Sequence, residues 1–280
     1  VQELSGLLFA YLGPLPAPLL PRWDVLVRRD GTRAIEMHPV LEANWLQPQE
    51  NAVDTTHTYY LHGQMMKTKG INAGQYYLRP IEGYDFERCE WGILKRRVYG
   101  GDNPEAEKGH PLLFPNALRV PTGPLESLHW RVPINDRQTQ IICMDFRPAE
   151  DGQNVDQPEI PVHYLPSGVG PDGEYDLLSF PSQDKMAYET AGPVNDRTEE
   201  HLGVSDKGII MFRKLLGEQL EVVARGEDPI GVIRDPVHNE CIRFDVSQGS
   251  AHPRWQDVRW EKADDSSPEI IVPQDHLAKA

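Results

Sequence analysis

Three side chains that can bind or orient a metal ion lie within nine positions of this sequence, in the stretch ENAVDTTHTYYLHG at residues 50–63. Asp54 precedes His57 by three residues, so on a helix its carboxylate would share a face with that imidazole. His57 and His62 are five residues apart, which on an α-helix is about 140° of rotation. The two rings would therefore come into line only at a π-type turn or at a helix end, and π-type turns occur mostly at functional sites.

The spacing alone leaves two interpretations open. His57 and His62 are either unrelated surface or core histidines, or ligands of one metal ion with Asp54 hydrogen-bonded to a ligating ring. Their segment is too apolar for a solvated helix face, since it also contains Tyr59, Tyr60, Leu61, Met65 and Met66. Neutral buried histidines beside a carboxylate favour the metal interpretation.

A mononuclear iron(II) site that activates oxygen needs a carboxylate beside its two histidines. Asp184, Asp196 and Asp206 are the candidates. Asp206 suits the first turn of a helix and Asp196 lies in a charged patch, so both have structural explanations. Asp184 has the weakest structural explanation, because we expect it to open a short, partly apolar helix that ends at Gly192-Pro193.

The middle of the chain is expected to form an antiparallel sheet. Strand patterns dominate residues 76–147, with a hairpin that turns near Asn135-Asp136. Asp30-Gly31, between two extended runs, predicts an earlier hairpin over residues 23–40. Residues 41–66 are helix-permissive and contain the His57 and His62 stretch.

Helices are expected to follow a Pro-, Gly- and Asp-rich irregular excursion at residues 148–180. Residues 205–226 predict a long helix, with Ser205 as its N-cap and Gly226 just past its end. Its buried stripe would comprise Ile209, Phe212, Leu216, Leu220 and Val223. The polar tail from about residue 246 should be irregular. Strands followed by helices, rather than alternating with them, indicate an α+β domain with its helices on one face of the sheet.

Charge and composition narrow the class of partner. The 280 residues carry 43 acidic and 28 basic side chains, a formal net charge of −15, which repels nucleic acid and anionic lipid. No apolar run approaches the ~20 residues of a membrane helix. We therefore expect a soluble, cytoplasmic protein without a nucleic-acid or membrane partner. Cys89, Cys143 and Cys241 are expected to be reduced thiols, because three separated cysteines suit neither a disulfide framework nor a thiolate metal site.

Several segments together resemble the catalytic domain of the large (alpha) subunit of Rieske non-haem iron oxygenases. The stretch ENAVDTTHTYYLHG resembles the Asp-x2-His-x4-His iron motif of that family. The phthalate dioxygenase-like branch, which also resembles biaryl O-demethylases, is matched by GLLFAYLGP before a Pro-rich linker, GHPLLFPN, HWRVPINDRQT and QDKMAYETAGPVNDRTEEHLGVSD. The resemblance covers nearly the whole chain.

The resemblance implies a helix-grip catalytic domain over residues 23–280, a curved antiparallel sheet around a long helix. It implies that His57, His62 and Asp184 bind Fe(II), and that Asp54 bridges this iron to the Rieske [2Fe-2S] cluster of a neighbouring subunit in a homotrimer or hexamer. Residues 1–22 would be the last strand of a Rieske domain and a Pro-rich linker. The Rieske cluster ligands, Cys-x-His and Cys-x2-His, have no match, and the chain starts with Val rather than Met. We therefore expect a segment of a longer protein, whose N-terminal Rieske domain is largely absent from this sequence.

The activity that the resemblance implies is that of a terminal oxygenase. Electrons from NAD(P)H would pass through a reductase or ferredoxin and the Rieske cluster to Fe(II), which with O₂ would hydroxylate an aromatic acid by ring dihydroxylation or by O-demethylation of a methoxy-aryl compound. Candidate anchors for an aryl carboxylate are Arg96, Arg97, Lys67 and Lys69. Two alternatives stay open: a non-catalytic helix-grip module that binds a small molecule, and a hydrolase with zinc at the same residues.

Overall fold

The computed structural model describes residues 1–244 except for four short gaps, at 71–76, 101–104, 107–108 and 123–124. The tail that was expected to be irregular lies outside the described residues. No helix among the described residues combines the length and the apolar character that a bilayer-crossing segment needs.

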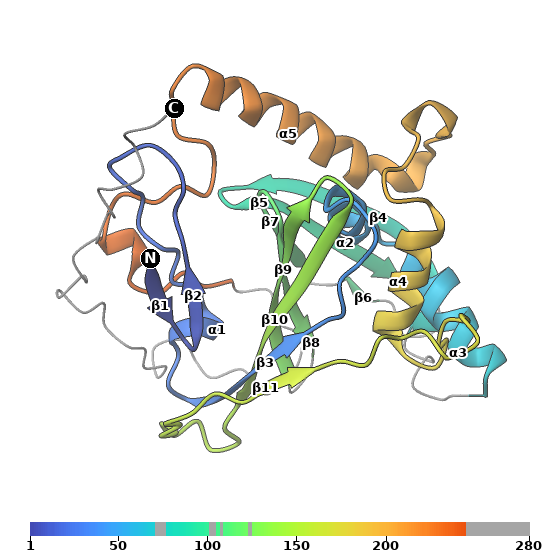
Figure 1. Ribbon diagram of the computed structural model, residues 1–280, viewed down its shortest axis with the longest axis horizontal. Helices are drawn as coiled ribbons and strands as arrows, with labels where there is room; N and C mark the ends of the chain where they lie inside the picture. The colour runs from blue at the N-terminus through green and yellow to red at the C-terminus, as the bar shows by residue number, and fades with distance from the viewer. Residues whose placement is uncertain (71–76, 101–104, 107–108, 123–124, 245–280) are drawn as a thin grey trace.

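A nine-stranded sheet forms the centre of the molecule (Figure 1). Its strands follow the order β11-β3-β10-β9-β8-β7-β5-β4, with β6 beside β5, and every pairing is antiparallel except that of β11 with β3. The strands are β3 (Gly31–Met37), β4 (Ile81–Cys89), β5 (Gly92–Tyr99), β6 (Glu105–Ala106), β7 (His110–Leu113), β8 (Ala117–Thr122), β9 (Leu125–Asn135), β10 (Gln138–Pro148) and β11 (Val162–Tyr164). The predicted antiparallel sheet is confirmed, as is its hairpin, where Asn135 pairs with Gln138.

Two further strands and several helices flank this sheet. The N-terminal strands β1 (Gln2–Leu4) and β2 (Leu7–Phe9) pair with each other in a small separate sheet. The longer helices are α2 (Leu46–Val53), α4 (Phe180–Thr190) and α5 (Lys207–Ala224). A π-helical turn (Thr58–Gly63) leads into α3 (Gln64–Thr68). Helices and strands are largely segregated along the chain, so the predicted α+β class is confirmed.

The hairpin predicted around Asp30-Gly31 is wrong. The residues before it form α1 (Asp24–Val27), a single helical turn, and the strand after it pairs with β10. All four residues of α1 are buried, and the Asp24 carboxylate accepts two hydrogen bonds, of 3.1 and 3.0 Å, from the Arg119 guanidinium of β8. This contact between distant parts of the chain overrides the local turn signal, because a strand here would turn alternate side chains of the segment away from the core.

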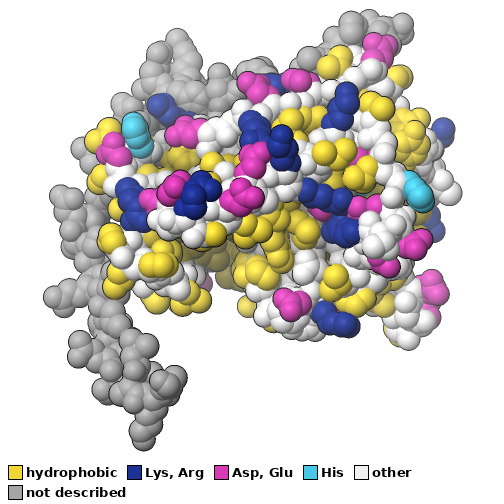
Figure 2. Space-filling model, turned by 90° about the horizontal axis from the view of Figure 1, so that it is seen from above, with side chains coloured by type: hydrophobic (Ala, Val, Ile, Leu, Met, Phe, Trp, Pro, Cys, Tyr) yellow, Lys and Arg dark blue, Asp and Glu magenta, His cyan; other side chains and the backbone are white. Residues whose placement is uncertain are grey.

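The predicted long helix is α5, and Gly226 follows its end with a φ of +78° as expected. The prediction of Ser205 as its N-cap is wrong, because Ser205 lies within a 3₁₀ turn at Val204–Asp206 and α5 begins only at Lys207. Figure 1 shows α5 across the top of the molecule, and Figure 2, seen from above, shows acidic and basic side chains interspersed with hydrophobic ones on that face.

Only the first half of α5 buries the predicted stripe. Phe212 is fully buried and packs with Val53 of α2 and Ile93 of β5 in one apolar cluster. Leu220 and Val223 were expected in the core, but they are 64% and 54% exposed. Periodicity identifies the apolar face of a helix, and it does not say how many turns of that face another layer covers.

The unequal burial along α5 predicts unequal mutational costs. Phe212→Ala should lower the free energy of unfolding by about 3–5 kcal/mol, since it leaves a cavity in the cluster, whereas Leu220→Ala should change it by less than about 0.5 kcal/mol. Urea unfolding of both variants measures these costs. Similar losses in the two variants would contradict this account of the packing.

Candidate metal centre

The π-helical turn brings His57 and His62 together. It spans Thr58–Gly63, with His57 in the position before its first residue. Each turn of a π-helix takes up about one residue more than an α-helical turn, so residues five apart come onto one face. The two imidazole ring centroids lie 5.2 Å apart, with the rings at 80°. The structure confirms the prediction that such a turn would align this pair.

Asp184 reaches the same point from α4. Its Oδ1 lies 3.3 Å from His62 Nε2, and one potential ligand atom from each of His57, His62 and Asp184 lies within 4.8 Å of the other two. Although Asp184 Oδ1 is buried, none of the described residues donates a hydrogen bond to it. A buried carboxylate oxygen that faces imidazole nitrogens and receives no donor is an arrangement that a cation would complete. The three residues therefore fit a metal ion.

The helix that carries Asp184 starts earlier than predicted. Its first residue is Phe180, and the Ser179 side chain caps it by accepting a hydrogen bond from the backbone N–H of Ser182. Asp184 thus lies in the second turn of α4 instead of opening the helix. The ring of Phe180, one turn before it, lies 4.9 Å from the His62 ring, so the start of α4 contacts the π-helical turn.

Both histidines are oriented through their Nδ1 atoms. His57 Nδ1 lies 3.1 Å from Asp54 Oδ2, which also accepts the His57 backbone N–H at 2.8 Å. His62 Nδ1 lies 2.8 Å from Oε1 of the fully buried Gln183. An oxygen acceptor at Nδ1 assigns the proton to that nitrogen and leaves Nε2 with a free lone pair, which is the form that binds a metal.

The electrostatics favour the same protonation states. Burial lowers the pKa of His62, which keeps that ring neutral. Burial alone would raise the pKa of Asp54, but hydrogen bonds from His57 and Thr56 hold it well below its usual range. Asp54 is therefore a charged acceptor at neutral pH, and His62 is a neutral donor of its lone pair.

The other two candidate carboxylates lie in local capping positions. Asp196 accepts the backbone N–H of Thr198 at the start of a 3₁₀ turn, and Asp206 Oδ2 accepts that of Gly203 at 2.6 Å. Neither belongs to a group of potential metal ligands among the described residues. Both carboxylates thus have structural roles, as expected, but Asp196 caps a turn, whereas the sequence had suggested a place in a charged patch.

A second group of potential ligands escaped the sequence analysis. Glu36, His38 and Cys143 also place ligand atoms within 4.8 Å of one another. His38 Nε2 lies 3.2 Å from Glu36 Oε1 and 3.5 Å from Cys143 Sγ, so these three groups already provide partners for one another. Burial raises the pKa of the Cys143 thiol well above its ordinary value, which keeps it protonated and a poor ligand. All three cysteines are free thiols, as predicted.

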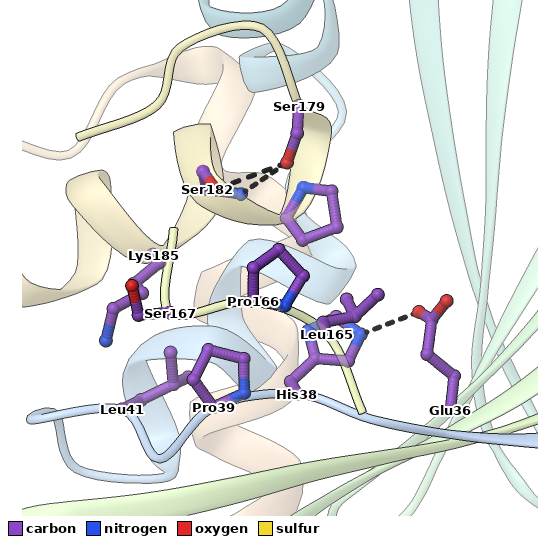
Figure 3. A pocket seen from close by; sticks show the side chains of 11 residues that line it. Glu36, His38, Pro39, Leu41, Leu165, Pro166, Ser167, Ser179, Ser182 and Lys185 are labelled. Atoms are coloured by element: carbon purple, nitrogen blue, oxygen red, sulfur yellow. Dashed lines mark hydrogen bonds and ion pairs between the residues drawn. The ribbon is translucent and has the colours of Figure 1, made fainter. Parts of the chain in front are cut away.

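Two neighbouring cavities lie between α4 and the sheet. One, of about 180 Å³, has Asp184, Phe180 and Arg131 in its wall. The other, of about 260 Å³, is shown in Figure 3, where Ser182 and Lys185 of α4 lie opposite the hydrogen-bonded pair of Glu36 and His38. Glu36 and His38 line both cavities. A small molecule in the first cavity would therefore lie beside a metal ion bound at Asp184.

The four predicted anchors for a carboxylate are not in the walls of these two cavities. Arg96 pairs with Asp85 and Glu87 on the sheet surface, and Arg97 donates a 2.8 Å hydrogen bond to Thr58 Oγ1. Lys67 and Lys69 are exposed. Sequence proximity to the histidine stretch was thus a poor guide to the residues that surround its cavity.

Known proteins resemble the chain at the level of sequence. The "LigXa C-terminal domain like" family matches residues 171–270. The 5,5′-dehydrodivanillate O-demethylase oxygenase subunit of Sphingobium sp. (strain NBRC 103272 / SYK-6) is 37% identical over 246 residues, which cover 86% of this chain and 56% of that protein. The phenoxybenzoate dioxygenase subunit alpha of Ectopseudomonas oleovorans is 29% identical over 83% of this chain and 59% of that protein. The phthalate 4,5-dioxygenase oxygenase subunit of Pseudomonas putida is 24% identical over 87% of this chain and 63% of that protein.

The fold has known relatives as well. A carbazole-bound variant oxygenase, in the oxygenase–ferredoxin complex of carbazole 1,9a-dioxygenase, matches with a TM-score of 0.51 and 17% identity over 90% of this chain and 68% of that chain. At this identity the match shows the fold alone. The chain spans 56 to 63% of the length of the three sequence relatives. With its motifs, these relatives place the chain in the Rieske non-haem iron oxygenase family, in the oxygenase subunits of the phthalate dioxygenase-like branch.

Proposed function

We propose that this chain is the catalytic part of a terminal oxygenase and that His57, His62 and Asp184 hold a mononuclear Fe(II) ion. The observation that supports this most strongly is the buried Asp184 Oδ1, which faces His62 and receives no hydrogen bond from the described part of the chain. Two histidines and one carboxylate on one side of an iron ion leave positions open for O₂ and a substrate. The bound iron would supply the oxygen-activating chemistry.

The residues around the proposed ligands hold, orient and shield them. Asp54 and Gln183 fix the rings of His57 and His62 through the Nδ1 atoms. The rings of Phe180 and Tyr77 lie 5.4 Å apart and both contact the His62 ring, so apolar groups limit the access of water to that side. A shielded pocket protects a reactive centre from side reactions.

The proposed substrate is an aromatic acid, attacked on its ring or at a methoxy group. Three sequence relatives are named for reactions of dehydrodivanillate, phenoxybenzoate and phthalate. In this chain the cavity beside Asp184 has apolar walls at Leu41, Ile141 and Phe180, which suit an aromatic ring.

We further propose that electrons reach the iron from NAD(P)H through a reductase or ferredoxin and a Rieske [2Fe-2S] cluster whose ligands are outside this sequence. Residues 1–22 would connect the domain that carries this cluster to the catalytic domain at residues 23–280. In a homotrimer or hexamer, Asp54 would face the cluster of a neighbouring subunit. Its carboxylate suits this role because it is charged, is 13% exposed, and bonds directly to the His57 ring.

The proposed ligand set predicts the iron content of variants. Anaerobically purified wild-type protein should contain about one iron per chain by elemental analysis, and His57→Ala and Asp184→Ala should each lose most of it, because removal of one of three protein ligands leaves two. Asp196→Ala is the matched control and should keep its iron, since that exposed carboxylate only caps a turn.

Three results would contradict this assignment. Iron retained in Asp184→Ala would mean that another carboxylate is the ligand. Wild-type protein that binds an aromatic ligand but no iron would favour the non-catalytic binding module. Substrate turnover with zinc and without oxygen or reductant would favour the hydrolase.

The position of Asp54 predicts a separate effect on affinity. Asp54→Ala should weaken Fe(II) binding by about 10–100-fold, because His57 loses the acceptor that orients its ring. An anaerobic Fe(II) titration monitored by calorimetry measures this affinity, with Asp196→Ala again as the control. Unchanged affinity in Asp54→Ala would rule out the orienting role.

A further inference from the structure

The sheet face that lines the cavity beneath α4 is polar at positions where a core would be apolar. The strand register places Glu36 of β3 opposite Cys143 of β10, and Cys143 opposite His129 of β9. Arg131 lies two residues beyond His129 on the same strand and therefore on the same face of the sheet. His129 and Arg131 both line the 180 Å³ cavity that includes Asp184. Polar groups in this position need partners, because burial removes them from water.

Arg131 has no carboxylate partner among the described residues. Its side chain is buried, with the residue only 5% exposed, yet Nε makes no hydrogen bond and Nη1 makes only a long contact of 3.4 Å with the His129 carbonyl. Two other buried arginines differ from it: Arg28 pairs with Asp30 and Glu126, and Arg119 pairs with Asp24 and Glu126. A buried cation that lacks a counter-ion lowers the stability of the fold, which suggests that Arg131 has a role other than stabilisation.

The acidic groups near Arg131 are already engaged. Glu36 is hydrogen-bonded to His38, and the Tyr188 hydroxyl accepts a hydrogen bond of 2.7 Å from Asn51. Asp184 would be neutralised by the metal ion of the proposed site. The other cation of this region, Lys185 in the neighbouring cavity, is paired with Glu189. Among the described residues in these two cavity walls, Arg131 is thus the cation that has no carboxylate partner.

We propose that Arg131 binds the carboxylate of the aromatic substrate in this cavity. A guanidinium presents two parallel N–H donors that match the two oxygens of a carboxylate. The ring of the acid would pack against Leu41, Ile141 and Phe180, in the direction of Asp184. The proposal rests on the proposed function and deepens it, because it assigns the selection of acids to one residue that is far in sequence from the histidine stretch.

Equilibrium binding of acids and their amides tests this proposal. Isothermal titration of the iron-loaded chain under anaerobic conditions would use benzoate and 3-phenoxybenzoate, each beside its amide. Arg131→Gln should weaken the binding of the acids at least tenfold and that of the amides less than twofold, since only the acids use the charged pair. Arg137→Gln is the matched control on the same hairpin; Arg137 is exposed, and its variant should bind both classes as wild type does.

Melting temperatures distinguish an arginine that anchors the substrate from one that stabilises the fold. Arg131→Met should unfold at the same or a higher temperature than wild type in the absence of ligand, because it removes an unpaired buried charge at similar volume. Millimolar benzoate should raise the melting temperature of wild type and not that of Arg131→Met. A structural arginine predicts the opposite first result, a lower melting temperature without ligand, and that would overturn the proposal.

The remaining outcomes are also decisive. Equal weakening of acids and amides in Arg131→Gln, or no binding of either acid by wild type, would overturn the assignment of Arg131. The same titrations with metal-free protein keep the two proposals apart. Acid binding that depends on Arg131 in a wild-type protein that never binds iron would support the anchor and overturn the proposed oxygenase function.

Discussion

The hydrogen bond between His62 Nδ1 and Gln183 Oε1 joins segments that are 121 residues apart, and the geometry of the candidate metal site depends on it. His57 and His62 come from the π-helical turn, whereas Asp184 comes from α4, so the three ligand atoms converge only if these elements hold a fixed relation. Gln183 is fully buried and its amide N–H₂ donates to the Leu177 carbonyl at 2.8 Å, which leaves Oε1 aimed at the imidazole. Polar networks that are satisfied in this way rigidify the groups they connect.

Other contacts hold the segment before the π-helical turn. The Arg213 guanidinium of α5 donates to Glu50 of α2 at 2.6 Å and to Glu200 at 2.6 Å, so α5 is attached to the helix that leads into the site. From the sheet, Lys95 Nζ donates to the Asp54 carbonyl at 3.0 Å. A chain with an excess of acidic groups thus places several of its cations where they hold the motif, whereas Arg131 has no such partner in the described ranges.

Local sequence patterns correctly predicted the features that depend on neighbouring residues in the chain. The spacing of His57 and His62 indicated a π-type turn, and the periodicity together with Gly226 indicated α5 and its C-terminal end. Predictions that depended on contacts between distant parts of the chain were less accurate. The Asp30-Gly31 hairpin was wrong because Asp24 pairs with a side chain of β8, and the exposure of Leu220 reflects how far the neighbouring layers extend. Glu36 and Arg131 could not be identified as cavity residues, because only the strand register and the placement of α4 bring them beside Asp184.

Anomalous diffraction at the iron absorption edge, from crystals grown anaerobically with Fe(II), tests the central claim most directly. The proposed iron site predicts one strong anomalous peak in each chain, at coordination distance from His57, His62 and Asp184. A peak between Glu36, His38 and Cys143 instead, or no peak at either group in iron-replete crystals, would contradict it.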